Sequence, residues 1–174
     1  MAYPDIVGML YLYCHECEYS HFRQKRKKDK DGVRRFAVEE IMTREVKSVF
    51  KDEPLLQVME LLSEYRLGAI LVKDRENIPC GVISKTDLAL IYKHGVDSQT
   101  AAKAIMSSPV QSCSADELLE DAIRKMIFTD VHRLFVHQST PDNIVGVISL
   151  SDAARIRSGS CHACISSRIK VDAP

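Results

Sequence analysis

The chain has 174 residues, of which 45% are apolar, enough for one compact domain with a core of its own. Its 24 Lys and Arg balance its 24 Asp and Glu, so no net field draws the whole chain towards nucleic acid or membranes. No apolar run reaches the length of about 20 residues that spans a bilayer. The short apolar stretch 6–13 lacks the basic flank and cleavage site of a signal peptide. We therefore expect a cytoplasmic protein without a membrane span.

The N-terminal tail, residues 1–37, contains two notable features. Cys14 and Cys17 form a C-x-x-C pair, which in a cytoplasmic protein indicates metal binding before a disulfide. The stretch from Arg23 to Arg35 carries eight Lys or Arg and two Asp, without interleaved aromatic residues or an apolar period. It is either a solvated linker or, since a cysteine knuckle beside a basic stretch is a common design, a nucleic-acid contact.

Residues 38–95 and 96–157 repeat one pattern at a nearly constant offset. The matches keep the same order along the chain, which chance seldom produces, so we treat them as two copies of one unit. The aligned pairs include Ile41 with Ile105, Met42 with Met106, Val46 with Val110, Asp52 with Asp116, Leu55 with Leu119, Val72 with Val136, Gly81 with Gly146, Ser84 with Ser149 and Asp87 with Asp152.

The first copy predicts a helix, two strands and a second helix. Asp52 is the expected cap of the first helix, and Pro54 occupies its first turn, where the missing N–H costs little. Apolar residues then recur at helical spacing through Leu62. The two strands are expected at 69–72 and 81–83, because these short runs are apolar and contain β-branched residues.

The second copy predicts the same elements. Ser114 and Glu117 read as a capping box for a helix that continues through Met126, and strands are expected at 134–136 and 145–148. One copy alone would leave one face of its sheet unburied. We therefore expect a single α/β (α+β) unit in which two halves pack around a pseudo-two-fold axis, flanked by cysteine-containing tails.

These residues carry a family resemblance over about residues 38–157. The pattern Ile-Met-Thr, a Val three residues on, the capped helix and then Gly-Val-Ile-Ser-x-x-Asp resembles a CBS domain, and its repetition resembles a CBS pair, or Bateman module. The resemblance implies two pseudo-symmetric clefts between the repeats that bind AMP, ADP, ATP or S-adenosylmethionine. It also implies a homodimer.

The Ser-x-x-Asp segments are the expected nucleotide contacts. Each lies where a strand meets a helix, and a helix N-terminus attracts phosphate. The serine hydroxyl can add a hydrogen bond, and the aspartate can hold the ribose hydroxyls, a role that the resemblance also implies. The alternative is that each segment is only a capping box. The residues concerned are Ser84, Thr86 and Asp87 in the first repeat and Ser149, Ser151 and Asp152 in the second.

The two repeats differ just before the first of these strands. His132 and Arg133 in the second repeat resemble a phosphate clamp of nucleotide-binding CBS proteins, because Arg presents a planar fork of donors. The first repeat has Gly68 and Ala69 there. We expect the second cleft to be better equipped for a phosphorylated ligand; the alternative is that Arg133 is an ordinary surface arginine.

A second C-x-x-C pair, Cys161 and Cys164, lies in the C-terminal tail 158–174. Together with Cys14 and Cys17 it supplies the four thiolates of a tetrahedral zinc site, provided that the fold brings the two tails together. Iron in a rubredoxin-like site or cluster, and redox-active cysteine pairs, are the alternatives. The remaining cysteines, Cys80 and Cys113, align with valines and are expected to be small core residues.

No catalytic motif is present among those we looked for: a nucleophile elbow, a P-loop or a His-Glu-x-x-His helix. We therefore expect a regulatory module, not an enzyme, that senses an adenosine ligand and acts on a protein partner. The alternatives are a metal-clipped nucleic-acid-binding protein that uses the basic stretch 23–35, and a redox or iron protein.

Overall fold

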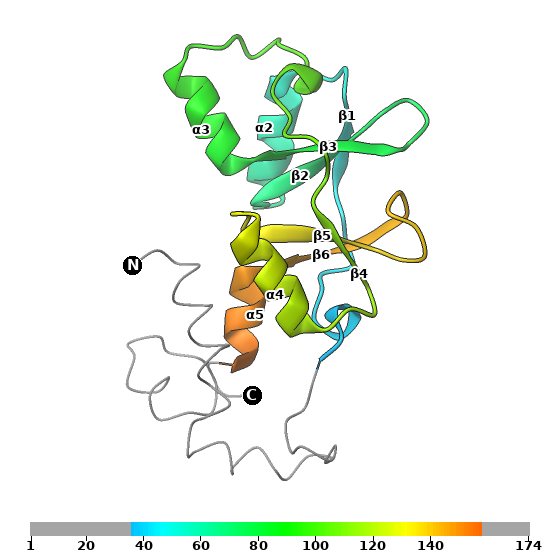
Figure 1. The fold of residues 1–174 in the computed structure, drawn as a ribbon. Helices are drawn as coiled ribbons and strands as arrows, with labels where there is room; N and C mark the ends of the chain where they lie inside the picture. The colour runs from blue at the N-terminus through cyan, green and yellow to red at the C-terminus, as the bar shows by residue number, and fades with distance from the viewer. Residues whose placement is uncertain (1–35, 158–174) are drawn as a thin grey trace, which may run out of the picture. The chain divides into compact units, whose positions relative to one another are not determined.

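The computed structural model describes residues 36–157. Within them the chain forms two compact units. The first unit comprises residues 44–112 and 137–145, and the second comprises residues 36–43, 113–136 and 146–157. Each unit carries a three-stranded sheet and two helices, which confirms the mixed α/β class (Figure 1).

The first sheet has the strand order β1-β2-β3, formed by Ser48–Phe50, Ala69–Lys73 and Pro79–Ser84. β1 pairs with β2 in parallel, and β2 pairs with β3 in an antiparallel hairpin. Helix α2, Leu55–Glu64, packs against β2, and helix α3, Lys85–Lys93, packs against β3. The predicted helices and hairpin are confirmed, while the three-residue strand β1 is an addition, too short to give a sequence signal.

The core of the first unit lies between this sheet and its helices. The central strand β2 buries three consecutive residues, because each of its faces is covered. α2 contributes side chains one helical turn apart, as its apolar spacing predicts. The buried cluster consists of Val49, Val58, Leu62, Ile70, Val72, Ile83 and Ala102.

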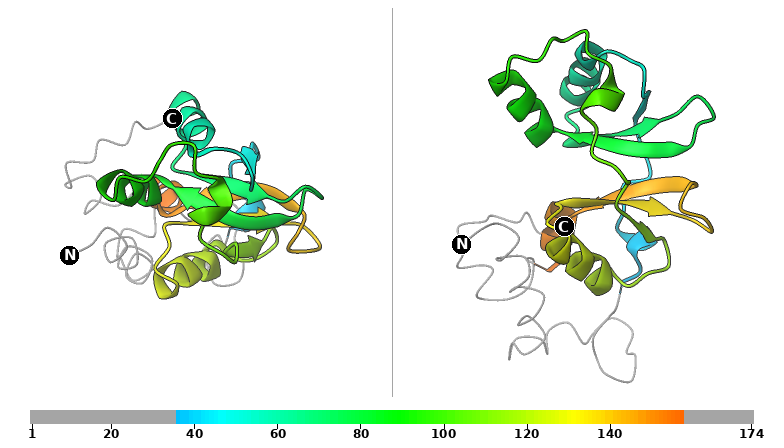
Figure 2. Two further views of the ribbon diagram at one scale, coloured as in Figure 1. Left: turned by 90° about the horizontal axis from the view of Figure 1, so that it is seen from above. Right: turned by 45° about the horizontal axis from the view of Figure 1, so that its top comes forward.

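The second sheet repeats this design with the order β4-β5-β6, formed by Ser112–Ser114, Arg133–His137 and Ile144–Ser149. β5 and β6 have the same burial patterns as β2 and β3. Helices α4, Leu119–Phe128, and α5, Leu150–Arg157, pack against each other, so they lie on the same side of this sheet (Figure 2).

The first residues of each repeat belong to the unit that contains most of the other repeat. A 3₁₀ helix, η2 at Val38–Glu40, belongs to the second unit, where Val38 N donates to Glu117 O at 2.9 Å. In the same unit Thr43 and Val147 exchange two backbone hydrogen bonds of 2.9 Å.

The 3₁₀ helix of the second repeat, η3 at Ala102–Ala104, belongs in the same way to the first unit. Ala102 N donates to Glu53 O at 2.8 Å, and Ser107 and Val82 exchange two backbone bonds of 2.9 Å. The boundaries of the compact units therefore differ from those of the sequence repeats.

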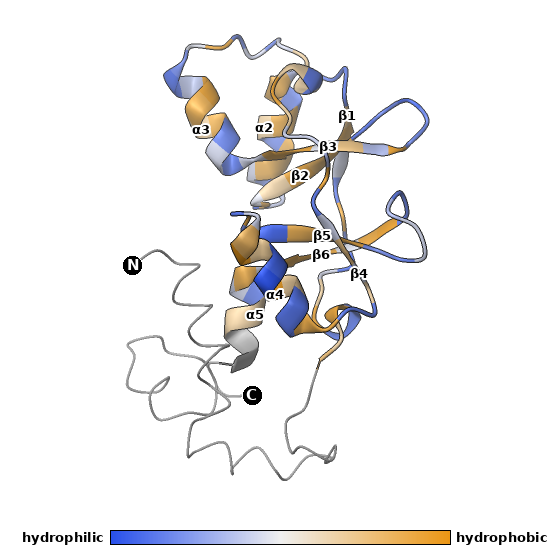
Figure 3. Cartoon of the chain, viewed as in Figure 1, coloured by the Kyte–Doolittle hydropathy of each residue, from blue (hydrophilic) through white to orange (hydrophobic). Residues whose placement is uncertain are grey.

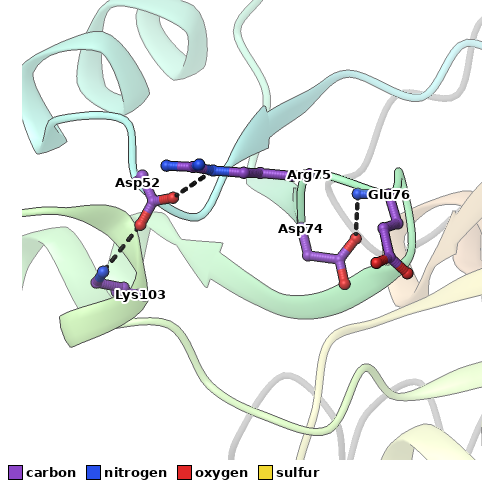
Figure 4. Close-up of polar contacts among 5 residues, drawn as sticks. All are labelled: Asp52, Asp74, Arg75, Glu76 and Lys103. Carbon is purple, nitrogen blue, oxygen red and sulfur yellow. Dashed lines mark hydrogen bonds and ion pairs between the residues drawn. The ribbon is translucent and has the colours of Figure 1, made fainter.

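The predicted caps of α2 and α4 are wrong. The N-cap of α2 is Pro54, without a side-chain cap, and Asp52 instead accepts from Arg75 Nε at 3.3 Å and Lys103 Nζ at 2.8 Å (Figure 4). These two cations draw Asp52 away from the helix, and the Lys103 hydrogen bond is the main cause that lowers the Asp52 pKa. The N-cap position of α4 is Leu118, which has no side-chain cap. Ser114 ends strand β4, where its amide donates to Glu117 Oε2 at 3.3 Å about one turn before the helix.

The apolar residues of both units gather on the strands and on the helix faces that meet them (Figure 3). No helix within residues 36–157 combines the length and the hydropathy that a membrane span requires.

Candidate functional site

The second unit holds the more elaborate candidate site, where β6 ends and α5 begins. Asp152 Oδ2 accepts from the Ser149 amide at 3.0 Å and from Ser149 Oγ at 2.6 Å, and the Asp152 amide donates to Ser149 Oγ at 3.3 Å. All three bonds engage one carboxylate oxygen and the hydroxyl. Both side chains are half-buried at a helix N-terminus, where backbone N–H groups and the helix dipole favour an anion.

The backbone brings His132 and Arg133 to this helix start. The amide of Leu150, the first residue of α5, donates to His132 O at 3.1 Å. Arg133, the first residue of β5, is half-buried. Burial lowers the pKa of its guanidinium, while the nearby Asp152 carboxylate acts in the opposite direction. His132 is exposed. The guanidinium of Arg133 and the backbone of His132 therefore lie beside a helix N-terminus within the second unit.

The first unit has the same framework without those cations. Asp87 Oδ2 accepts from the Ser84 amide and from Ser84 Oγ, both at 2.7 Å, and Ser84 is the N-cap of α3. The amide of Lys85 donates to Gly68 O at 3.1 Å, the equivalent of the bond to His132. The residues at 68 and 69, glycine and alanine, offer no charge at this place.

Two further predicted contacts, Thr86 and Ser151, lie in the first turns of α3 and α5. Both side chains are exposed. The hydrogen-bonded Ser84–Asp87 pair forms a full capping box, and the same three bonds join Ser149 and Asp152. The interpretation of these motifs as capping boxes is confirmed, and the capping bonds engage only Oδ2 of each aspartate.

The four cysteines of the predicted metal clip, Cys14, Cys17, Cys161 and Cys164, lie outside the described residues, as does the basic stretch 23–35. Residues 36–157 contain no cluster of three or more His, Cys, Asp or Glu with metal-ligand geometry. Cys113 is buried, and burial raises the pKa of its thiol to about 12. Cys80 packs against the core of the first unit, so both cysteines serve as small core residues.

Sequence reasoning missed the contact that fixes the strand leading into each site. Met42 packs on Gly146 in the second unit, and Met106 packs on Gly81 in the first. Each methionine comes from the start of one repeat and contacts a glycine of the other repeat. The signal was present in the sequence, since Ile-Met and Gly-Val-Ile-Ser recur together in both copies.

A family model described as CBS domain matches residues 38–94 and again residues 102–159. The chain belongs to the CBS domain family. Its CBS pair is 29% identical over 119 residues to the CBS domain-containing protein YhcV of Bacillus subtilis (strain 168). The aligned region covers 68% of this chain and 83% of YhcV.

Solved CBS structures share the fold. The CBS domain protein PAE2072 from Pyrobaculum aerophilum, complexed with AMP, matches with a TM-score of 0.63 at 22% identity. The matched region covers 67% of this chain and 89% of the PAE2072 chain. The CBS domain pair of protein MJ0100, in complex with 5′-methylthioadenosine and S-adenosyl-L-methionine, has a TM-score of 0.66 at 17% identity and covers 72% of this chain and 98% of its own.

Proposed function

We propose that this CBS pair is a regulatory module, not an enzyme, that binds an adenosine ligand of the AMP, ADP, ATP or S-adenosylmethionine class. The observation that carries the proposal is that Arg133 lies near Asp152 while the backbone of His132 bonds to the start of α5, beside the Ser149–Asp152 pair. The AMP complex of PAE2072 and the S-adenosyl-L-methionine complex of MJ0100 support the ligand class.

In the proposed complex the phosphates lie at the N-terminus of α5. Arg133 supplies a charge-assisted hydrogen bond, Ser151 supplies a hydroxyl group, and the helix dipole adds a partial positive charge. Ser149 can donate to a phosphate when its hydroxyl turns away from Asp152 Oδ2, and the Ser149 amide then keeps the aspartate in place. The Asp152 carboxylate accepts from the ribose hydroxyls through the oxygen that Ser149 does not use. The half-burial of Arg133 strengthens its attraction to a phosphate, because a desolvated charge is screened less by water.

The first repeat offers Ser84, Thr86 and Asp87 without a neighbouring cation pair. We therefore propose that its site prefers a less charged adenosine ligand or binds the same ligand more weakly. The module then reports ligand occupancy to a protein partner, since we identify no nucleophile or general base with a catalytic arrangement in either site.

Isothermal calorimetry with AMP, ADP, ATP and S-adenosylmethionine tests this function. We expect saturable binding of at least one of them, and Asp152→Ala should abolish the tighter binding event. Asp87→Ala is the matched control, because it removes the equivalent carboxylate from the first repeat and should leave that event intact. No binding of any of the four ligands, together with binding of a short oligonucleotide, would favour the nucleic-acid alternative instead.

We also propose that Cys14, Cys17, Cys161 and Cys164 bind one zinc ion; iron is the competing metal. The arrangement of the second unit supports this proposal. Residues 36–43 and helix α5 both belong to it, so both tails leave the same unit. Phe36 O accepts from Leu119 N at the start of α4, and α5 ends at the same end of this unit (Figure 1). Two tails that leave the same end of one unit can bring four thiolates to one ion.

A further inference from the structure

Met106 carries a thioether that the first unit leaves partly accessible. The side chain is half-buried and packs against the core of that unit. A Cβ atom on Gly81 would lie 2.7 Å from Met106 Cγ, so the side chain lies directly against strand β3. The backbone beside it is joined to the same strand, because Ser107 and Val82 exchange two hydrogen bonds. The methionine and these two bonds together hold the start of the second repeat on β3.

The equivalent methionine of the second unit is closed off from solvent. Met42 occupies the same place against Gly146 and is only 8% exposed. The other two methionines within residues 36–157 lie at the extremes of exposure. Met126 is fully buried, and Met59 is 45% exposed on helix α2. In the described part of the chain, Met106 is therefore the one methionine that is both accessible and part of a core contact.

A thioether that solvent can reach reacts with hydrogen peroxide. A lone pair of the sulfur attacks one peroxide oxygen, the O–O bond breaks, and a sulfur–oxygen bond forms. The sulfur is oxidised by two electrons to a sulfoxide. The proton of the transferred oxygen passes to the departing hydroxide, so the peroxide is reduced to water. The apolar side chain thereby gains one strongly polar oxygen atom.

The cysteines of residues 36–157 do not compete for peroxide at neutral pH, because peroxide attacks thiolates. Burial raises the pKa of the Cys113 thiol to about 12. Burial, followed by the nearby Asp74 carboxylate, also raises the pKa of the Cys80 thiol. Both thiols therefore stay protonated. A thioether has no proton to lose, so its exposure sets its rate of oxidation.

The surroundings of Met106 Sδ do not accept a polar oxygen. Gly81 closes one side, and the apolar cluster of the first unit lies on another. Cys80 Sγ lies 4.0 Å from Met106 Sδ, but a thiol is a weak donor, and this one is nearer to Val72 O at 3.5 Å. A sulfoxide oxygen is either buried there without a full hydrogen bond or turns to solvent and draws the side chain off β3. Both outcomes weaken the contact.

We propose that Met106 is an oxidation site of the first unit, at which a peroxide converts the thioether to the sulfoxide and loosens the start of the second repeat from β3. The equivalent contact of Met42 in the second unit stays intact. Strand β3 ends at Ser84, the N-cap of α3, so the contact supports the first candidate site and not the second. This modification goes beyond the proposed ligand binding and does not depend on it.

Peroxide treatment of the full chain without nucleotide tests the site. Dithiothreitol is added afterwards, because it reduces oxidised cysteines of the tails but leaves sulfoxides in place. Peptide mapping by mass spectrometry should find Met106 oxidised well before Met42 and Met126. The melting temperature should fall by about 2–8 °C, the shift that accompanies the loss of one core contact. Oxidation of Met42 as fast as Met106, or oxidised Met106 without a fall in melting temperature, would overturn the proposal.

Met106→Leu is the matched variant, because it keeps the volume and the apolar surface but has no sulfur. Peroxide should leave its melting temperature unchanged although Met59 is still oxidised. Met59→Leu is the control and should lose as much stability as the natural chain. Methionine sulfoxide reductases should restore the melting temperature of the oxidised natural chain. An equal loss in Met106→Leu, or a loss that persists after Met106 has been reduced, would assign the effect to another group.

Discussion

The side chain of Met106 fills the space that a Cβ atom on Gly81 would occupy. Such a Cβ would lie 2.6 Å from Met106 Sδ and 3.0 Å from Met106 Cβ. Met42 blocks Gly146 in the same way in the second unit. Since a methionine Cβ cannot move without its backbone, any larger residue at position 81 would be crowded by Met106 even after the end of the methionine side chain had moved away.

Gly81→Ala should therefore destabilise the protein by about 1–3 kcal/mol, the usual cost of overpacking a core. Chemical denaturation measures it. Met106→Ala also destabilises, because it leaves a cavity, but the double variant should be more stable than the sum of the two single changes predicts. If the two changes in the free energy of unfolding simply added, the residues at positions 81 and 106 would not be in contact.

The capping boxes predict a stability effect that is independent of any ligand. Ser84→Ala and Ser149→Ala should each cost about 1 kcal/mol in thermal or chemical denaturation of the ligand-free protein, because each removes an N-cap acceptor. Ser84→Thr is the conservative control and should retain most of the stability. Equal stability of natural and alanine variants would mean that these serines are not caps in solution.

Arg133 should distinguish phosphate from nucleoside. Arg133→Ala should weaken AMP binding about tenfold to a hundredfold, the worth of a charge-assisted hydrogen bond of about 1.5–3 kcal/mol, and leave adenosine binding nearly unchanged. Calorimetry with both ligands measures the difference. An equal loss for AMP and for adenosine would show that Arg133 does not contact the phosphate. If Arg133 does contact it, Ala69→Arg, which adds the equivalent arginine to the first repeat, should improve AMP binding there.

The buried thiol of Cys113 should make the protein sensitive to alkaline pH. Its pKa is about 12 in the folded state, against an ordinary value of 9.0, because burial disfavours the thiolate. Below pH 9 the Cys113 thiol is protonated in the folded and in the unfolded chain, so the free energy of unfolding does not depend on its ionisation. Between pH 9 and 12 the Cys113 thiol ionises only in the unfolded chain. The free energy of unfolding therefore falls by about 1.4 kcal/mol per pH unit.

Cys113→Val, which introduces the residue found at the aligned position 49, should remove that dependence. Denaturation curves at pH 8 and at pH 10 measure it. The same loss of stability in Cys113→Val as in the natural chain would assign the effect to other groups.

The metal clip predicts about one metal ion per chain in elemental analysis, as expected for a single four-cysteine site. Cys161→Ser should release the ion and lower the melting temperature, more at neutral than at acid pH because thiolates are the ligands. Nucleotide affinity should stay nearly unchanged, since the cysteines lie outside the repeats. If the protein without metal were as stable as the protein with metal, redox chemistry would remain as the role of the paired cysteines. A coloured purified protein would indicate iron.

Elements fixed by neighbouring residues could be predicted from the sequence. The hairpins, the four long helices and the Ser84–Asp87 and Ser149–Asp152 contacts each depend on partners a few residues apart or on a local apolar period. The family resemblance singled out the same serines and aspartates, whereas the backbone bond between His132 and the start of α5 was not predicted and joins residues of different elements. The predicted caps of α2 and α4 were wrong for two reasons. Asp52 pairs with Lys103, which is far away in the sequence, and Ser114 bonds to Glu117 one turn before α4 begins.

The sequence by itself determined that this protein is a pair of CBS repeats, because the repeated apolar and turn residues act over short separations. Only the tertiary structure decided that the first residues of each repeat complete the unit of the other repeat, because those backbone bonds join residues far apart in the chain, such as Thr43 and Val147. It alone also decided which aligned apolar residues are buried. Met59 and Ile123 occupy the same position in the pattern, and only the packing around each helix makes one exposed and the other buried.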